Sequence, residues 1–238
     1  MSSSGLWALA DIPDGYIIYN TFLMMRYYPL NLDLKNKKCL VVGAGQVAAR
    51  KVRRLLECGA CVSVIGPQAA PAIKTLAEKK KIAFKNRGVA LRDLRNAYLV
   101  VSAAGDRQIN SRVSSYCFRR GKLVNVADAP DESNFILPAV VRRGRLTITV
   151  STDGLSPALS KKIRQGLEKE FGGEYVKLLR LMQELRPLAL RKIKSPVLRK
   201  VFFQKAVREE IIKLLRENKD TLARKKVTSF IRCGQFSR

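Results

Sequence analysis

The stretch Lys38-Cys-Leu-Val-Val-Gly-Ala-Gly-Gln-Val-Ala-Ala-Arg-Lys51 decides the fold of this chain. It contains residues 39–43, a short apolar run rich in β-branched side chains, as expected of a buried parallel strand. Residues 46–58 follow with apolar side chains at helical spacing, and Gly59 stands where a helix commonly ends. The sequence therefore predicts a strand, a glycine-rich turn and a helix in immediate succession.

The turn, Gly43-Ala-Gly-Gln-Val-Ala48, has the pattern G-x-G-x-x-A. Gly43 permits a tight turn, Gly45 lets the backbone approach a pyrophosphate, and Ala48 allows the helix to pack closely on the strand. The start of the helix then offers free N–H groups and a partial positive charge to a phosphate. We expect a dinucleotide here, the alternative being a tight turn that binds no ligand.

Strand and helix patterns alternate through the first part of the chain. Further strands are expected at residues 61–65, 82–84, 98–103 and 123–126, and further helices at residues 70–81, 92–96 and 109–120. Alternation at these lengths predicts βαβ units with helices on both faces of a parallel sheet. We therefore predict an α/β fold, a Rossmann-type doubly wound parallel sheet, over residues 29–137.

The pattern changes after Pro138. Residues 139–141 and 146–150 predict two strands of a different, antiparallel element. Helical patterns follow from Ser156 to the end of the chain, with breaks expected at Gly172-Gly173, Pro187 and Pro196. An amphipathic stripe predicts a helix over residues 197–216.

The composition excludes several classes of protein. The 238 residues include 46 Lys and Arg against 19 Asp and Glu, a net charge of +27, and 47% are apolar, which suits a packed core. No apolar stretch reaches the length of about 20 residues that a membrane span needs, and residues 1–15 show no secretory signal. Without histidine, the chain has no His-ligated metal site and no Ser-His or Cys-His nucleophile.

The number and spacing of the cysteines indicate a reducing cellular compartment. They are odd in number and scattered, at Cys39, Cys58, Cys61, Cys117 and Cys233. This pattern predicts free thiols in a reducing cytoplasm. Cys58 and Cys61 have C-x-x-C spacing, for which we expect buried structural thiols, the alternative being a redox pair.

The start of the chain is mixed in composition. Residues 1–28 form an N-terminal extension, and Met24-Met25 offers a second start of translation. We expect translation to begin there, so that the residues before it carry no function.

The residues at the end of the second predicted strand do not decide between NAD and NADP. NAD enzymes commonly place an acidic residue here to bind the ribose hydroxyls. Residues 64–68 instead read Val-Ile-Gly-Pro-Gln, and no nearby arginine clearly suits the 2′-phosphate of NADP. Gln68 or main-chain groups would then hold the ribose.

A second constellation, Asn125-Val-Ala-Asp-Ala-Pro130, directly follows the predicted strand at residues 123–126. Ligands of doubly wound sheets bind beyond the carboxyl ends of the strands, so Asp128 would face the crevice where a nicotinamide ring lies. We expect Asp128 to be catalytic, the alternative being an aspartate that caps a turn before Pro130.

Four blocks together resemble the precorrin-2 dehydrogenase family, the N-terminal module of siroheme synthases, some members of which are also sirohydrochlorin ferrochelatases. They are Lys38–Lys51, Asn125–Pro130, Asn134-Phe-Ile-Leu-Pro138 and Ser151-Thr-Asp-Gly-Leu-Ser-Pro-Ala-Leu159. The resemblance implies NAD-dependent oxidation of precorrin-2 to sirohydrochlorin, followed in some members by insertion of Fe²⁺ to give siroheme. It also implies a homodimer, with a dimerisation segment at residues 138–170 and a basic helical C-terminal domain at residues 171–238.

The resemblance also assigns site residues. The family's essential aspartate falls on Asp128, and its active-site serine segment falls on Ser151 and Thr152. Cofactor contacts fall on Gln46 and Val47, beside Gly43, Gly45 and Ala48, and on Pro67 and Gln68. Arginines suited to the substrate's carboxylates are Arg142, Arg119, Arg120, Arg143 and Arg145. Asp153 departs from the pattern, because the family often has glycine there.

The strong positive charge leaves a competing function open. A dinucleotide-sensing regulator could bind nucleic acid through the basic tail, since such a field attracts polyanions. No known nucleic-acid-binding motif occurs in the sequence. We therefore expect neither nucleic acid nor a membrane as a partner.

Overall fold

The computed structural model describes residues 26–233, with the side chains described through residue 231. The expected N-terminal extension and its second start of translation lie almost wholly outside these residues. The chain divides into two units, Met1–Asn31 and Leu32–Arg238, and every described helix and strand lies in the second. In this described part, no helix is long and apolar enough to span a membrane.

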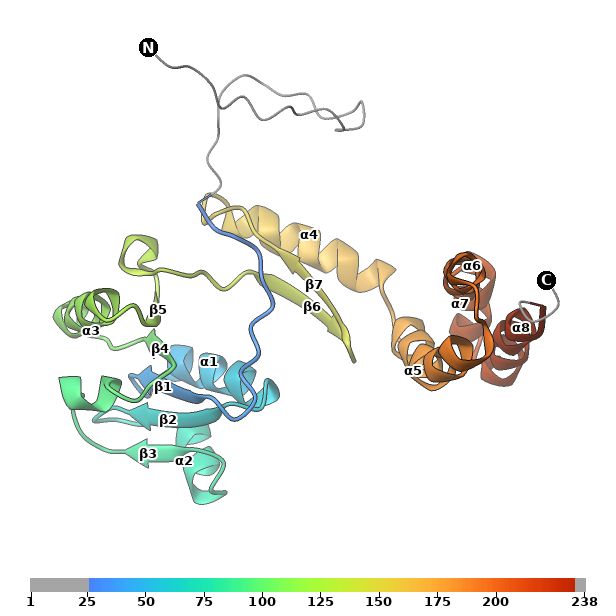
Figure 1. The fold of residues 1–238 in the computed structure, drawn as a ribbon. Helices are drawn as coiled ribbons and strands as arrows, with labels where there is room; N and C mark the ends of the chain where they lie inside the picture. Colours follow the sequence, from blue (N-terminus) through green and yellow to red (C-terminus); the bar gives the residue numbers. More distant parts are fainter. Residues whose placement is uncertain (1–25, 234–238) are drawn as a thin grey trace, which may run out of the picture. The chain divides into compact units, whose positions relative to one another are not determined.

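A five-stranded parallel sheet forms the first half of the second unit (Figure 1). Its strand order is β3-β2-β1-β4-β5, with every neighbouring pair parallel. The strands are β1 (Lys38–Val42), β2 (Cys61–Ile65), β3 (Ala83–Lys85), β4 (Leu99–Ser102) and β5 (Leu123–Val126). The order reverses between β1 and β4, as in a doubly wound sheet, and the predicted fold class is confirmed.

Apolar layers cover both faces of the sheet. Alternate residues of β1 point to opposite faces, so Cys39 packs in one core and Leu40 in the other. The first core lies beneath helices α1 (Gln46–Glu57) and α2 (Pro71–Glu78). The second lies beneath the short 3₁₀ helix η1 (Leu91–Leu94) and helix α3 (Arg107–Arg119).

The segment after β5 runs back along that strand and forms hydrogen bonds with the backbone groups on its outer edge. The Asn134 side chain accepts a hydrogen bond from the Val124 N–H and donates one to the Lys122 carbonyl, each 2.8 Å long. The Ser133 hydroxyl accepts a bond from the Val126 N–H. These side chains replace a neighbouring strand, so the block around Asn134 has a structural role at the sheet edge.

Beyond the sheet, β6 (Ala139–Arg143) and β7 (Leu146–Val150) form the expected antiparallel hairpin. Helix α4 (Pro157–Glu170) packs on it. The Arg143 guanidinium donates hydrogen bonds to the carbonyls of Phe171 and Glu168, which fixes the end of α4 against the hairpin.

Four helices follow and share one apolar core. They are α5 (Glu174–Lys192), α6 (Pro196–Ala206), α7 (Glu209–Arg216) and α8 (Asp220–Cys233). Gly172-Gly173 and Pro196 separate helices as expected. The division of the chain into domains at residues 137 and 170 stays a prediction.

Two expectations for these helices were wrong. Pro187 lies inside α5 instead of ending it. The proline is exposed, so water can bind the carbonyl that it leaves unpaired, while Leu185 and Ala189 anchor the helix on both sides of it.

The helix expected over residues 197–216 is two helices, because α6 ends at Ala206 and α7 begins at Glu209. The break lets Phe202 and Ile211 both reach the core, while Val207 of the expected stripe is exposed.

A partly buried ion pair fixes the connection from β3 to β4. The Asp93 carboxylate accepts two hydrogen bonds of 2.7 Å from Arg87 and one of 2.9 Å from the Ala90 N–H. Only 6% of the Asp93 side chain is exposed. The bond from Arg87 holds the pKa of Asp93 well below its ordinary value, although burial alone would raise it.

Replacing Asp93 with Asn should lower the free energy of unfolding by about 2 kcal/mol at neutral pH, because a buried charged hydrogen bond is lost. A carboxyl group with a depressed folded-state pKa stabilises the protein above its unfolded pKa of about 4, and this contribution is lost as the pH falls through the folded value. Urea unfolding should therefore show a smaller difference between wild type and variant near about pH 3 than at neutral pH. Asp153→Asn, at an exposed position, is the control, and a difference independent of pH would refute the expectation.

Candidate active site

The glycine turn lies at the point where the strand order reverses. Gly43 follows β1 with φ = +97°, and a Cβ atom there would lie 2.2 Å from the carbonyl oxygen of Ala103, which follows β4. Only glycine fits both the backbone angle and this close approach. The turn after β1 and the turn after β4 are thereby held together at the carboxyl edge of the sheet.

The turn fits a bound dinucleotide. A Cβ at Gly45 would have no atom within 4 Å, so open space faces the backbone there. Helix α1 starts at Gln46 with no side-chain cap and no acidic residue in its first turn. Unsatisfied N–H groups at a helix start, beside a glycine with free space in front, suit a pyrophosphate.

A buried polar network that the sequence reasoning missed supports the turn after β4. Asn110 on α3 accepts hydrogen bonds from the Ser102 hydroxyl, at 2.7 Å, and from the Ala104 N–H, at 3.1 Å. Its amide also donates to the Ala104 carbonyl. The available signal was a polar residue, Asn110, between apolar positions of a predicted helix.

Pro67 and Gln68 lie exposed after β2, at the same edge of the sheet. Gly66 brings this segment close to the glycine turn, because a Cβ there would lie 3.0 Å from the Ala44 nitrogen. The Ala70 N–H donates to the Ala44 carbonyl, which ties the two turns together. The predicted cofactor contacts in both turns are thus neighbours.

Asp128 lies just beyond β5, also at the carboxyl edge. The preceding residue, Ala127, donates its N–H to the Ser102 carbonyl at the end of β4. Asp128 is exposed and has φ = +58°, a backbone conformation unusual for a residue other than glycine. The structure therefore places Asp128 at the sheet edge that carries the glycine turn.

The predicted residues after β7 are local neighbours. The Thr152 hydroxyl accepts a hydrogen bond from the Ser156 N–H and lies 3.1 Å from the Ser160 hydroxyl. The Ser151 hydroxyl accepts one from the Asp153 N–H. Asp153 has φ = +51°, which explains in physical terms why glycine suits that position.

Arg142 lies away from the glycine turn. Its guanidinium contacts Glu57, at 3.4 Å, and the Cys58 sulfur, at the far end of α1. A helix of 12 residues is about 18 Å long, so the two sites are separated by its length.

Two of the other predicted arginines also have structural contacts. Arg143 is bound to main-chain carbonyls, and Arg120 lies over the Tyr116 ring at the end of α3. Because α3 begins at the carboxyl edge of the sheet and ends at the opposite edge, Arg120 lies away from the glycine turn. The assignment of arginines to substrate carboxylates stays a prediction.

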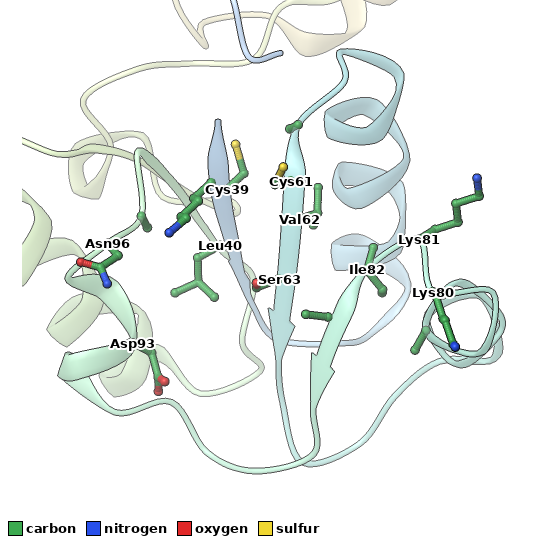
Figure 2. Close-up of a pocket in the computed structure, with 15 residues that line it drawn as sticks. Cys39, Leu40, Cys61, Val62, Ser63, Lys80, Lys81, Ile82, Asp93 and Asn96 are labelled. Atoms are coloured by element: carbon green, nitrogen blue, oxygen red, sulfur yellow. The ribbon is translucent and has the colours of Figure 1, made fainter. Parts of the chain in front are cut away.

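A cavity of about 650 Å³ lies at the opposite, amino edge of the sheet. In Figure 2, Cys61 lies at the start of β2, with Asp93 and Asn96 on one side of the strands and Lys80 and Lys81 on the other. The glycine turn and Asp128 do not line it.

The expectation of buried structural thiols at Cys58 and Cys61 was wrong for Cys61. Cys58 is half-buried, and Cys61 is exposed at the first position of β2. Cys39 and Cys117 are buried, and burial raises the pKa of each thiol to about 11, so both are poor nucleophiles.

Known proteins match both halves of the second unit. A family model described as "Putative NAD(P)-binding" matches residues 30–139, and one described as "Sirohaem biosynthesis protein central" matches residues 143–170. The precorrin-2 dehydrogenase of Priestia megaterium is 34% identical over 164 residues, which cover 69% of this chain and 81% of that protein. The chain belongs to the precorrin-2 dehydrogenase family.

A solved structure of a family member, SirC, a precorrin-2 dehydrogenase, matches with a TM-score of 0.74 and 28% identity, covering 87% of this chain and 99% of that one. The siroheme synthase of Methylococcus capsulatus is 35% identical over 183 residues. Those residues make up 77% of this chain but 39% of the synthase, so the chain spans well under half of that relative. The Rossmann domain of this family member is thus an NAD(P)-binding domain.

Two glycine variants should separate folding from cofactor binding. Gly45→Ala should leave the melting temperature unchanged, because its Cβ meets no atom, yet weaken NAD⁺ binding by roughly tenfold or more by filling the space for the pyrophosphate. Gly43→Ala should instead lower the melting temperature, because its Cβ collides with Ala103. Thermal melts and NAD⁺ titrations check both. Unchanged NAD⁺ affinity in a folded Gly45→Ala protein would remove the turn from the binding site.

Proposed function

We propose that this chain oxidises precorrin-2 to sirohydrochlorin with NAD⁺ as the electron acceptor. The observation that carries the proposal is the likeness to SirC over 99% of that dehydrogenase, with the glycine turn in place. The relation to the Priestia megaterium enzyme, over 81% of its length, also supports it.

The chain's own residues would bind and orient the reactants. Gly43, Gly45, Gln46, Val47 and Ala48 would hold the pyrophosphate side of NAD, and Pro67 and Gln68 the ribose side. When bound, NAD supplies the hydride acceptor. Residues 64–68 contain neither the acidic residue typical of NAD enzymes nor an arginine for NADP, so competition between the two dinucleotides in a binding titration is the test of this choice.

Asp128 would act on the macrocycle. A carboxylate oxygen of Asp128, exposed at the carboxyl edge of the sheet, would accept the proton that leaves precorrin-2 during the two-electron oxidation, or orient its pyrrole N–H groups. Ser151 and Thr152 would contribute hydroxyl groups to substrate binding, and Arg142 a charge for its carboxylates.

The charge of Asp128 can be tested without disturbing its backbone. Asn tolerates positive φ angles, so Asp128→Asn should fold and bind NAD⁺ like wild type, whereas Asp128→Ala also carries backbone strain. Turnover of precorrin-2 by the Asn variant should fall by about 100-fold or more, the typical contribution of a general base. Near wild-type turnover would remove Asp128 from the mechanism.

An anaerobic assay tests the function itself. Purified protein, NAD⁺ and enzymatically made precorrin-2 should yield NADH and sirohydrochlorin in equal amounts, followed by their spectra. NAD⁺ binding without either product would refute the proposed dehydrogenase.

The siroheme synthase relatives favour one addition, a ferrochelatase activity. Fe²⁺ added to sirohydrochlorin without NAD⁺ should then give siroheme at a rate above the blank.

We also propose a homodimer formed through the hairpin and α4. Leu159 and Ile163 lie one helical turn apart on α4 and are 47% and 41% exposed, and Leu155, just before the helix, is 88% exposed. Of the residues of α4, only Ser160 is buried within the chain. An exposed apolar stripe of this kind suits a second copy of the same surface.

A cytoplasmic location is supported by the free thiols of the four described cysteines.

A charge placed in the stripe should separate the subunits. Leu159→Glu should shift the mass measured by light scattering from dimer to monomer, because the carboxylate would be buried without a partner. Gln165→Glu adds the same charge at an exposed position away from the stripe and should leave the dimer intact. A dimeric Leu159→Glu protein would place the interface elsewhere.

A further inference from the structure

Residues 185–208 contain no acidic residue. This segment covers the end of α5 and all of α6, which pack against each other within the helical bundle, drawn from orange to dark red in Figure 1. It carries eight basic residues, namely Arg186, Arg191, Lys192, Lys194, Arg199, Lys200, Lys205 and Arg208. The segment is therefore the part of the bundle where positive charge is least balanced.

The acidic residues of the bundle do not neutralise this segment. Helices α5 to α8 and their connections contain six acidic residues, and each forms an ion pair with a basic residue outside residues 185–208. The pairs are Glu174–Arg216, Glu184–Arg224, Glu209–Arg216, Glu210–Lys226, Glu217–Lys219 and Asp220–Lys177. Within the described part of the chain, none of the eight cations forms an ion pair, so their charge attracts an anionic partner.

The outer side of α6 combines this charge with exposed apolar side chains. Val197 and Val201 lie one helical turn apart and are 70% and 37% exposed. Lys200 and Gln204 are exposed on the same side of the helix. Phe202, on the opposite side, is buried in the core of the bundle. The helix therefore has one side that the chain itself buries and one that it leaves uncovered.

Cations flank both edges of this outer side. The Arg186 guanidinium, on α5, lies 5.0 Å from the centroid of the Phe203 ring on α6. On the other edge, the Lys205 ammonium lies 5.7 Å from the centroid of the Phe230 ring on α8. We call this surface the α6 face, and it consists of Val197, Val201, Lys200, Gln204, Arg186 and Lys205.

The chemistry of the α6 face favours an acidic protein as its partner. Helices that bind membranes insert Trp, Phe or Leu, whereas both phenylalanines of α6 pack in the bundle core. Nucleic acids bind through phosphate contacts or through bases stacked on aromatic rings, and neither uses a pair of valines. A second copy of the face brings like charges together. An apolar centre with a positive rim instead complements an apolar stripe with a negative rim.

We propose that the α6 face docks an acidic amphipathic helix of another protein. Apolar side chains of that helix, at i, i+3, i+4 and i+7, pack against Val197 and Val201. Its Asp and Glu side chains lie opposite Arg186, Lys200 and Lys205, which sets its orientation and speeds association. The interaction goes beyond the proposed dehydrogenase activity and is measured without turnover.

Two labelled peptides of equal charge test the proposal. Both are helix-forming, about 20 residues long and built from Glu and Ala. One has Leu at i, i+3, i+4 and i+7, and the other has Ser at those positions. In fluorescence anisotropy with the full chain, the Leu peptide should bind about tenfold more tightly or better, because only it buries apolar surface on the two valines. Equal affinities would overturn the proposal.

Variants locate the binding surface. Val197→Ser and Lys200→Glu should each weaken binding of the Leu peptide by about tenfold, since one removes apolar contact and the other places like charges together. Both positions are exposed, so thermal melts should stay unchanged. Lys213→Glu makes the same charge change at an exposed position on α7 and should bind like wild type. Equal losses in Lys200→Glu and Lys213→Glu would reduce the effect to the general charge of the chain and overturn the α6 face.

Competition tests the class of partner. Neither a DNA duplex nor vesicles of phosphatidylcholine and phosphatidylserine should displace the Leu peptide at physiological salt. If either one displaces it and itself binds less well to Lys200→Glu, the face belongs to that polyanion and the protein partner is wrong. A chain that binds the Leu peptide as expected but does not oxidise precorrin-2 refutes the proposed function alone.

Discussion

The contact between Gly43 and Ala103 is the constraint on which the site depends. It joins the turn after β1 to the turn after β4, at the one place in the sheet where the strand order reverses. Any side chain at residue 43 would push these turns apart and move both α1 and the Ser102–Asn110 network. This approach of two backbones, with the hydrogen bonds from the Ala103 N–H to the Val42 carbonyl and from the Ala127 N–H to the Ser102 carbonyl, sets the start of α1 beside the end of β5.

The outer strand shows how the fold supports an exposed aspartate. β5 has β4 on one side only, and a strand edge with unpaired N–H and C=O groups is a poor support for a catalytic side chain. Ser133 and Asn134 bind that edge with their side chains. The two motifs therefore have different roles. Asn134 hydrogen-bonds to the edge of β5, and Asp128 lies beyond the end of that strand.

Local features of this fold could be predicted from the sequence, and contacts between distant segments could not. The strand, turn and helix around Gly43 lie within 20 residues, so spacing and glycine placement suffice. The helix break predicted at Pro187 was wrong because the packing of Leu185 and Ala189 outweighs one lost hydrogen bond. The contact of Arg142 with Glu57 joins residues 85 positions apart. No periodicity or motif carries such information.

Asp128 has a backbone conformation that glycine would adopt more easily than aspartate. A left-handed residue other than glycine costs about 1 kcal/mol, less for Asp and Asn, and glycine would adopt the conformation freely. Asn36 and Asn218, and the charged Lys80 and Asp153, also have positive φ angles. Glycine at position 128 would relieve the backbone but remove the carboxylate from the carboxyl edge of the sheet. Backbone strain and the proposed role of Asp128 therefore favour opposite residues.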